Sequence, residues 1–136
     1  MTEEVRKVLV ERDLPYPPER IWRALTQSHL LEEWLMKTDF RPDVGSAFSF
    51  SAEWGAVRGE VLEADPPTSL SYTWGDDHLK STVTWTLTEM DTGTRLKLEQ
   101  TGFPDDQPRY FMGAKAGWPR FLDNLERVLG QQEESK

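Results

Sequence analysis

Histidine is the side chain best suited to acid–base chemistry near neutral pH, and it occurs twice in this chain of 136 residues. His29 stands where a short helix is expected to begin, and His78 follows Gly75, Asp76 and Asp77 in an expected turn. The sequence has no HExxH motif, no paired histidine ligands and no GxSxG motif. We therefore expect a helix-start role for His29, a turn role for His78, no metal site and no cofactor.

The carboxylates and glycines also lack a catalytic pattern. Glu60, Glu99 and Arg58 lie in expected strands, and alternation with the apolar residues turns both glutamates toward water. The glycines have neither the spacing of a phosphate loop nor a following Lys-Ser/Thr, so we interpret them as close-packing and bulge positions: Gly55, Gly59, Gly113 and Gly117. We therefore assign no catalytic residue. Whether the protein is an enzyme stays open, but the lack of a catalytic or metal motif favours a protein without catalytic activity.

The aromatic side chains are the one feature of the sequence that points to a possible binding site. Eight of them are expected to converge between the sheet and the last helix: Phe48, Phe50, Trp54, Tyr72, Trp74, Trp85, Trp118 and Phe121. An empty cavity of about 300 Å³ would cost about 7 kcal/mol, which is comparable with the stability of a whole domain. The aromatic rings therefore either fill this space as a core, or line a cavity that accepts a guest, and both alternatives remain open.

A long helix must supply one wall of this space. Apolar residues recur at three- and four-residue steps from Pro108 to Leu129, which predicts a helix with one apolar face. Asp105 and Asp106 are N-cap candidates, and Gly130 is expected to end the helix as a C-cap. Pro119 predicts a kink near Lys115, or a break with the longer half beginning at Pro119.

The rest of the chain predicts a sheet and two short helices. Expected strands cover residues 5–14, 38–42, 46–53, 56–64, 69–75, 81–89 and 94–101, with turn signals between them. Short helices are expected at 18–26 and 29–35. This order predicts an α+β fold in which a curved antiparallel sheet of about seven strands wraps around the long C-terminal helix.

Composition limits the class of protein. The length suits a single domain spanning residues 1–136, and no apolar run is long enough to cross a membrane or direct export, so we expect a cytoplasmic protein. The chain has no cysteine, which excludes disulfides and thiolate ligands. A formal charge of −8 with scattered Lys and Arg argues against nucleic acid and membrane partners. A monomer and a weak homodimer both remain possible.

Five segments carry a resemblance to a known superfamily. They are YPPERIWRALT, LLEEWLMKTDFRPDVGSAFSF, GEVLEADPPTSLSYTW, STVTWTLTEMDTGTRLKLEQTGF and GWPRFLDNL, which together cover nearly the whole chain. In these segments the chain resembles the START-like (Bet v 1-like, SRPBCC) superfamily with the helix-grip fold. That group includes polyketide cyclase/dehydratase-like proteins and the Aha1-type C-terminal domain of the Hsp90 ATPase activator. The segments are packing and turn signatures, and the group shares no single set of catalytic residues.

The resemblance implies a hydrophobic ligand cavity between the sheet and the last helix. Our first hypothesis is a module that binds an apolar or aromatic small molecule, lined by Phe48, Phe50, Trp54, Trp74, Trp85, Met112, Trp118 and Phe121. The second is a protein that interacts with an Hsp90-type chaperone. The third is a cyclase- or dehydratase-like enzyme, which would need a buried acid or base that the sequence does not display.

Overall fold

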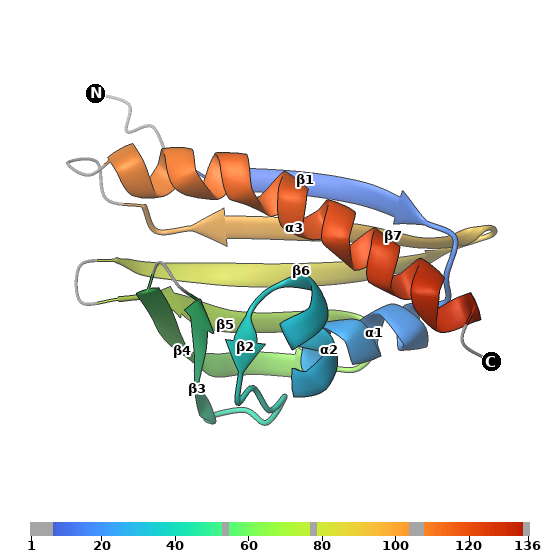
Figure 1. Cartoon of the computed structure of the whole chain (residues 1–136), viewed down its shortest axis with the longest axis horizontal. Helices are drawn as coiled ribbons and strands as arrows, with labels where there is room; N and C mark the ends of the chain where they lie inside the picture. Colours follow the sequence, from blue (N-terminus) through green and yellow to red (C-terminus); the bar gives the residue numbers. More distant parts are fainter. Residues whose placement is uncertain (1–6, 53–54, 77–78, 104–107, 135–136) are drawn as a thin grey trace.

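Alternating apolar and polar residues build the strands of one antiparallel sheet. The computed structural model of the chain describes residues 7–52, 55–76, 79–103 and 108–134. Its elements are β1 (Lys7–Leu14), α1 (Pro18–Thr26), α2 (Ser28–Trp34), β2 (Lys37–Thr38), β3 (Ala47–Ala52), β4 (Gly55–Asp65), β5 (Ser69–Gly75), β6 (Lys80–Met90), β7 (Gly93–Thr101) and α3 (Pro108–Glu134). The strands form one sheet in the order β1-β7-β6-β5-β4-β3-β2 (Figure 1). The predicted fold is confirmed.

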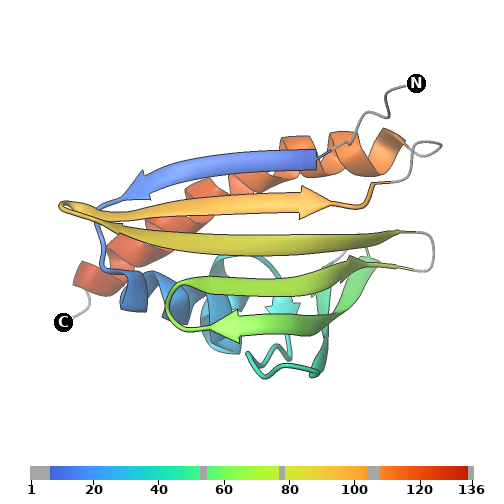
Figure 2. The same cartoon turned by 180° about the vertical axis from the view of Figure 1, so that it is seen from behind.

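One face of the sheet carries the core. Val83, Trp85 and Leu87 of β6 are buried on this inner face, while the threonines between them are half-buried on the other. Trp85 pairs with Leu70 of β5 and Leu98 of β7, so three strands contribute to the same layer. The helices lie on the inner side, and the view from behind shows the other face of the sheet with no helix across it (Figure 2).

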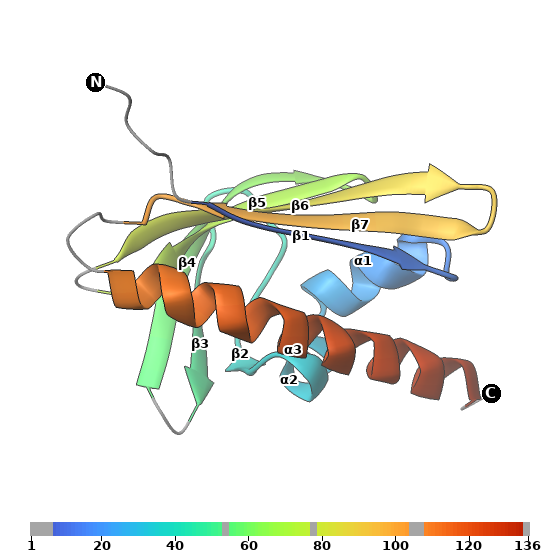
Figure 3. The ribbon, with the colours of Figure 1, turned by 90° about the horizontal axis from the view of Figure 1, so that it is seen from above.

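Helix α3 runs along the inner side of the sheet as the second layer (Figure 3). Its second half is anchored in the core by Trp118, Leu122, Leu125, Val128 and Leu129, all of which are buried. Arg12 of β1 donates hydrogen bonds to Asp123 at 2.9 Å and Glu126 at 2.6 Å. Arg20 of α1 donates to the carbonyl of Leu129. Within the described residues, no helix combines the length and apolar character that a membrane crossing requires.

The second strand is shorter than the sequence predicts. We expected it to cover residues 38–42, but β2 consists of Lys37–Thr38. The Thr38 hydroxyl donates to the Ser49 carbonyl at 2.6 Å, and an Asp39 carboxylate oxygen accepts from the Ser49 N–H at 2.9 Å. Side chains thus take the hydrogen bonds that a longer strand would make, and the chain turns so that Phe40 enters the core.

The predicted break at Pro119 and the predicted end at Gly130 are both wrong, whereas the alternative of a kink near Lys115 stays a prediction. Helix α3 is continuous through Pro119, so there is no break, and it continues past Gly130 to Glu134. Buried Trp118 and Leu122 hold the chain on both sides of the proline, and Leu129 holds it before Gly130. Tertiary packing therefore outweighs the two local stop signals. The expected N-caps, Asp105 and Asp106, lie outside the described residues.

Replacing Pro119 by Ala should stabilise the protein. Proline inside a helix costs about 3 kcal/mol through a lost hydrogen bond and a clash, and its stiffening of the unfolded chain returns up to about 1 kcal/mol. Urea unfolding of Pro119→Ala should therefore show a free energy of unfolding about 2 kcal/mol higher than the wild type.

The control is Pro42→Ala, because Pro42 is exposed in the loop before β3. This change acts mainly on the unfolded chain, so it should lower the free energy of unfolding by about 0.5 kcal/mol. Equal changes in the two variants would contradict the assignment of strain to Pro119.

Candidate functional site

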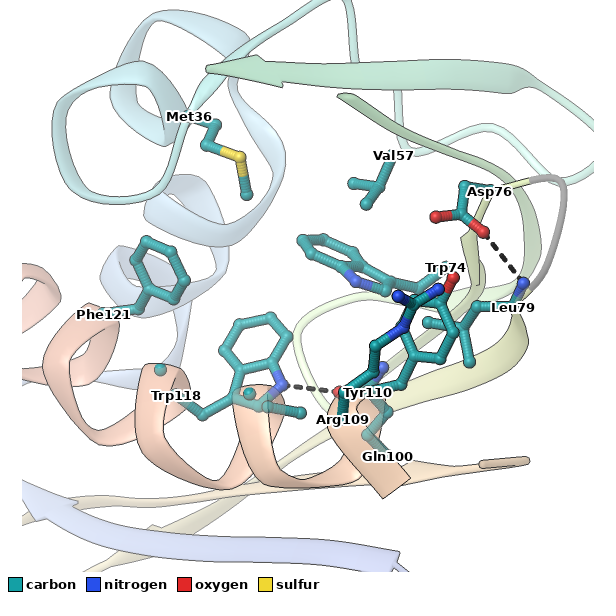
Figure 4. Close-up of a pocket in the computed structure, with 13 residues that line it drawn as sticks. Met36, Val57, Trp74, Asp76, Leu79, Gln100, Arg109, Tyr110, Trp118 and Phe121 are labelled. Atoms are coloured by element: carbon teal, nitrogen blue, oxygen red, sulfur yellow. Dashed lines mark hydrogen bonds between the residues drawn. The ribbon is translucent and has the colours of Figure 1, made fainter. Parts of the chain in front are cut away.

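A cavity of about 290 Å³ lies between the first half of α3 and the inner face of the sheet. Helix α3 forms one wall, and strands β4, β5 and β7 form the opposite one (Figure 4). The loop after β5 and Met36, which lies between α2 and β2, complete the lining. The lining residues are Met36, Val57, Trp74, Asp76, Leu79, Gln100, Arg109, Tyr110, Gly113, Ala114, Gly117, Trp118 and Phe121. Most of these side chains are apolar, as expected of a pocket for a small organic molecule.

Two glycines on α3 keep this space open. Gly113 and Gly117 are four residues apart, so both lie on the same face of the helix and line the cavity. A Cβ atom at Gly113 would meet no atom within 4 Å, and one at Gly117 would lie 3.8 Å from Phe121 Cε2. The interpretation of these two glycines as close-packing positions is therefore wrong. Close packing applies to Gly59, where a Cβ atom would lie 1.9 Å from the Thr73 carbonyl oxygen.

The structure divides the predicted site residues between two regions. Trp74, Trp118 and Phe121 line the cavity together. Phe48, Phe50 and Trp85 are buried in the core and do not line it. Met112 has 59% of its surface exposed, because it lies one helical step, about 100°, away from Gly113. Trp54 lies outside the described residues. Ligand binding by any of these residues stays a prediction.

The core and the cavity are neighbouring parts of one interior. Phe40, Phe48, Phe50 and Tyr72 form a cluster with ring centroids 5.0 to 6.3 Å apart. Tyr72 accepts a hydrogen bond from the Trp85 indole at 2.8 Å, and burial raises the pKa of its hydroxyl well above the ordinary value. These rings therefore fill one region of the interior, and a cavity remains beside it. That this cavity accepts a guest stays a prediction.

A chain of buried hydrogen bonds forms the polar part of the cavity wall. The Trp118 indole N–H donates to Gln100 Oε1 at 2.6 Å, and Gln100 Nε2 donates to Ser81 Oγ at 2.8 Å. The Ser81 hydroxyl donates in turn to the Trp74 carbonyl at 2.5 Å. Gln100 is 1% exposed, Ser81 2% and Trp118 3%. This chain joins α3 to β7, β6 and β5 and places one buried amide among the apolar side chains of the cavity wall.

Gln100 and Ser81 are not among the residues that were expected to line the cavity. A signal was present, because Gln100 continues the inward series of Leu96 and Leu98, and Ser81 precedes Val83 and Trp85 on the inner face. An inward polar residue in such a series needs a partner when it is buried. Its partner, Trp118, is distant in sequence and could not be read from the strand pattern.

Charged groups stand at the mouth of the cavity. Asp76 and Arg109 line it and are both exposed, and the Asp76 carboxylate accepts from the Leu79 N–H at 2.9 Å.

Among the described residues, no aspartate, glutamate, lysine, arginine or histidine side chain is buried. These residues also contain no group of three or more histidine, cysteine, aspartate or glutamate side chains that could hold a metal ion. His29 is the second residue of α2 and is exposed, whereas His78 lies outside this part of the chain. Glu60 is exposed, as alternation predicts.

Comparison with known proteins identifies relatives of the whole fold. A family model described as "Activator of Hsp90 ATPase homolog 1-like protein" matches residues 15–130. The crystal structure of protein MLL2253 from Mesorhizobium loti is 53% identical, with a TM-score of 0.90 over 93% of this chain and 98% of that one. Protein CV1439 from Chromobacterium violaceum is 29% identical, with a TM-score of 0.78 over 91% of this chain and 96% of that one.

A more distant likeness concerns the fold alone. DynU16, a protein of the dynemicin biosynthetic locus, is 23% identical, with a TM-score of 0.83. The match covers 93% of this chain but 48% of DynU16, so this chain corresponds to about half of that protein. No curated protein matches this sequence.

Alanine at Gly113 should stabilise the protein. The new methyl group enters open space, and alanine is favoured over glycine in a helix by about 0.5 to 1 kcal/mol. The free energy of unfolding of Gly113→Ala, measured in urea, should therefore rise by that amount.

Gly59→Ala provides the contrast, because the same methyl group would collide with the backbone of β5. It should lower the free energy of unfolding by about 2 kcal/mol. A loss of stability in Gly113→Ala would mean that the space beside this glycine is filled.

Proposed function

The chain belongs to the family of activator of Hsp90 ATPase homolog 1-like proteins, and we propose that it binds a small apolar or aromatic molecule in the cavity beside α3. The observation that carries this proposal is the absence of side chains at Gly113 and Gly117, which lie over the cavity in the middle of a helix. Alanine at these positions would favour the helix and fill space. Keeping glycine is therefore costly for stability, and a guest gives a physical reason for it.

The energetics of the cavity support the same proposal. At about 24 cal/mol per Å³, leaving a dry void of 290 Å³ would cost about 7 kcal/mol. Because Trp74, Trp118 and Phe121 line the cavity with aromatic surface, water there would find few hydrogen-bond partners. Displacing such water with an apolar guest is favourable.

Binding can be tested by a thermal shift with flavonoids, fatty acids, sterols and aromatic polyketides. A ligand at 100 times its dissociation constant adds about 2.7 kcal/mol, which should raise the Tm of a chain of this length by roughly 8 °C. In Gly117→Leu the new side chain occupies the cavity, so the shift should disappear.

The matched control is Ala116→Leu, which adds a similar bulk at the neighbouring exposed position of α3. It should keep the wild-type shift. An equal shift in Gly117→Leu would mean that the ligand binds elsewhere. No shift with any compound in the wild type would contradict small-molecule binding.

Interaction with an Hsp90-type chaperone is the second candidate function. The description of the matching family favours it, because that description names the activation of an Hsp90 ATPase. The test is the ATPase rate of a bacterial-type Hsp90 with and without the purified protein, together with a pull-down. An unchanged rate and no contact would contradict this candidate.

A further inference from the structure

The orientation of the Gln100 amide is fixed by its two neighbours. An indole N–H can only donate, so the group that faces Trp118 must be Oε1 of Gln100. The Ser81 hydroxyl donates to the Trp74 carbonyl, which can only accept, so Ser81 Oγ must receive its hydrogen bond from Gln100 Nε2. The amide therefore cannot flip without losing both bonds inside the protein.

Half of the hydrogen-bonding capacity of this amide remains for a guest. A glutamine amide has two N–H donors and two acceptor lone pairs on its oxygen. Within the described part of the chain, Gln100 uses one donor on Ser81 and one lone pair for Trp118. The second N–H and the second lone pair belong to a side chain that lines the cavity and is 1% exposed. A buried amide with an unused N–H and an unused lone pair favours a guest that carries an oxygen atom able to form hydrogen bonds.

The surroundings of Gln100 favour a neutral guest group. The charged residues among the described lining are Asp76 and Arg109, and both are exposed at the mouth. Because no charged side chain of the described residues is buried, an ionised group beside Gln100 would lose its hydration without a buried opposite charge to pair with, which is expensive. A hydroxyl or carbonyl oxygen meets the amide without this penalty.

We propose that Gln100 determines the specificity of the cavity, so that it selects neutral aromatic molecules bearing a hydroxyl or carbonyl oxygen over hydrocarbons of the same size. This inference rests on the proposed function, since it requires that the cavity accept a guest. The volume suggests the size of that guest. An engineered cavity of about 150 Å³ holds benzene in another protein, so 290 Å³ suits a molecule of about two fused rings.

The test compares naphthalene with 2-naphthol, which differ by one hydroxyl and are both neutral at pH 7. Equilibrium dialysis gives the dissociation constant of each, and their ratio reports how well the site accommodates the oxygen. In Gln100→Met, which keeps the side-chain length but removes the amide, the preference for 2-naphthol should fall by about three- to tenfold. The affinity for naphthalene should stay within about twofold, since no polar contact is lost.

Gln27→Met is the matched control, because Gln27 is exposed between α1 and α2 and does not line the cavity. It should keep the wild-type ratio. If both probes bind and Gln100→Met leaves the ratio unchanged, the inference about Gln100 is overturned while the proposed function stands. If neither probe binds the wild type, the inferred guest is wrong and this inference is overturned, whereas the proposed function is decided by the thermal-shift panel.

A second pair of variants protects the test against misfolding. Gln100→Met leaves the buried Trp118 N–H without its acceptor, which destabilises the fold. Trp118→Phe removes that donor, so the double variant Trp118→Phe/Gln100→Met has apolar groups on both sides. The preference for 2-naphthol over naphthalene should be lower in the double variant than in Trp118→Phe, by about the same factor that separates Gln100→Met from the wild type. Equal ratios in these two proteins would also overturn the inference.

Discussion

The contact between Trp118 and the sheet is the interaction on which the rest of the interior depends. The indole packs against Trp74, Trp85 and Phe121 with ring centroids 5.3 to 5.7 Å apart, and its N–H is bound by Gln100. A buried N–H needs a hydrogen-bond acceptor. The ring contacts and this hydrogen bond therefore together define the position of α3 on the sheet and its rotation about its own axis. On one side of this contact the helix is packed into the core, and on the other it covers the cavity.

The division of α3 into two halves explains how one fold holds a filled core and an open cavity. Beyond Trp118 the helix is bound to other elements, with Arg12 reaching Asp123 and Glu126. Before Trp118 its inner face carries Gly113 and Gly117, which leave space. The well-packed half stabilises the protein, while the other half borders the cavity at a cost in helix stability.

Polar groups in this interior are few, and each takes part in at least one hydrogen bond among the described residues. Gln100 and Ser81 connect α3 with three strands, whereas the Tyr72–Trp85 hydrogen bond lies within the aromatic core. Among the described residues, no buried side-chain nitrogen or oxygen lacks a hydrogen-bond partner. Such networks give a core a defined geometry. The amide of Gln100 differs from the others because it also reaches the cavity.

The sequence by itself determined the order of the elements and the face on which each side chain lies. Periods of two and 3.6 residues are local properties, so Trp85 and Trp118 could both be assigned to the interior. Only the tertiary structure decided that Trp85 fills the core and that Trp118 borders the cavity. It also decided that α3 continues through Pro119 and Gly130, and that Gln100 meets Trp118. The physical reason is that periodicity fixes the direction of a side chain, whereas its neighbour and its distance from the opposite wall depend on elements far apart in the chain.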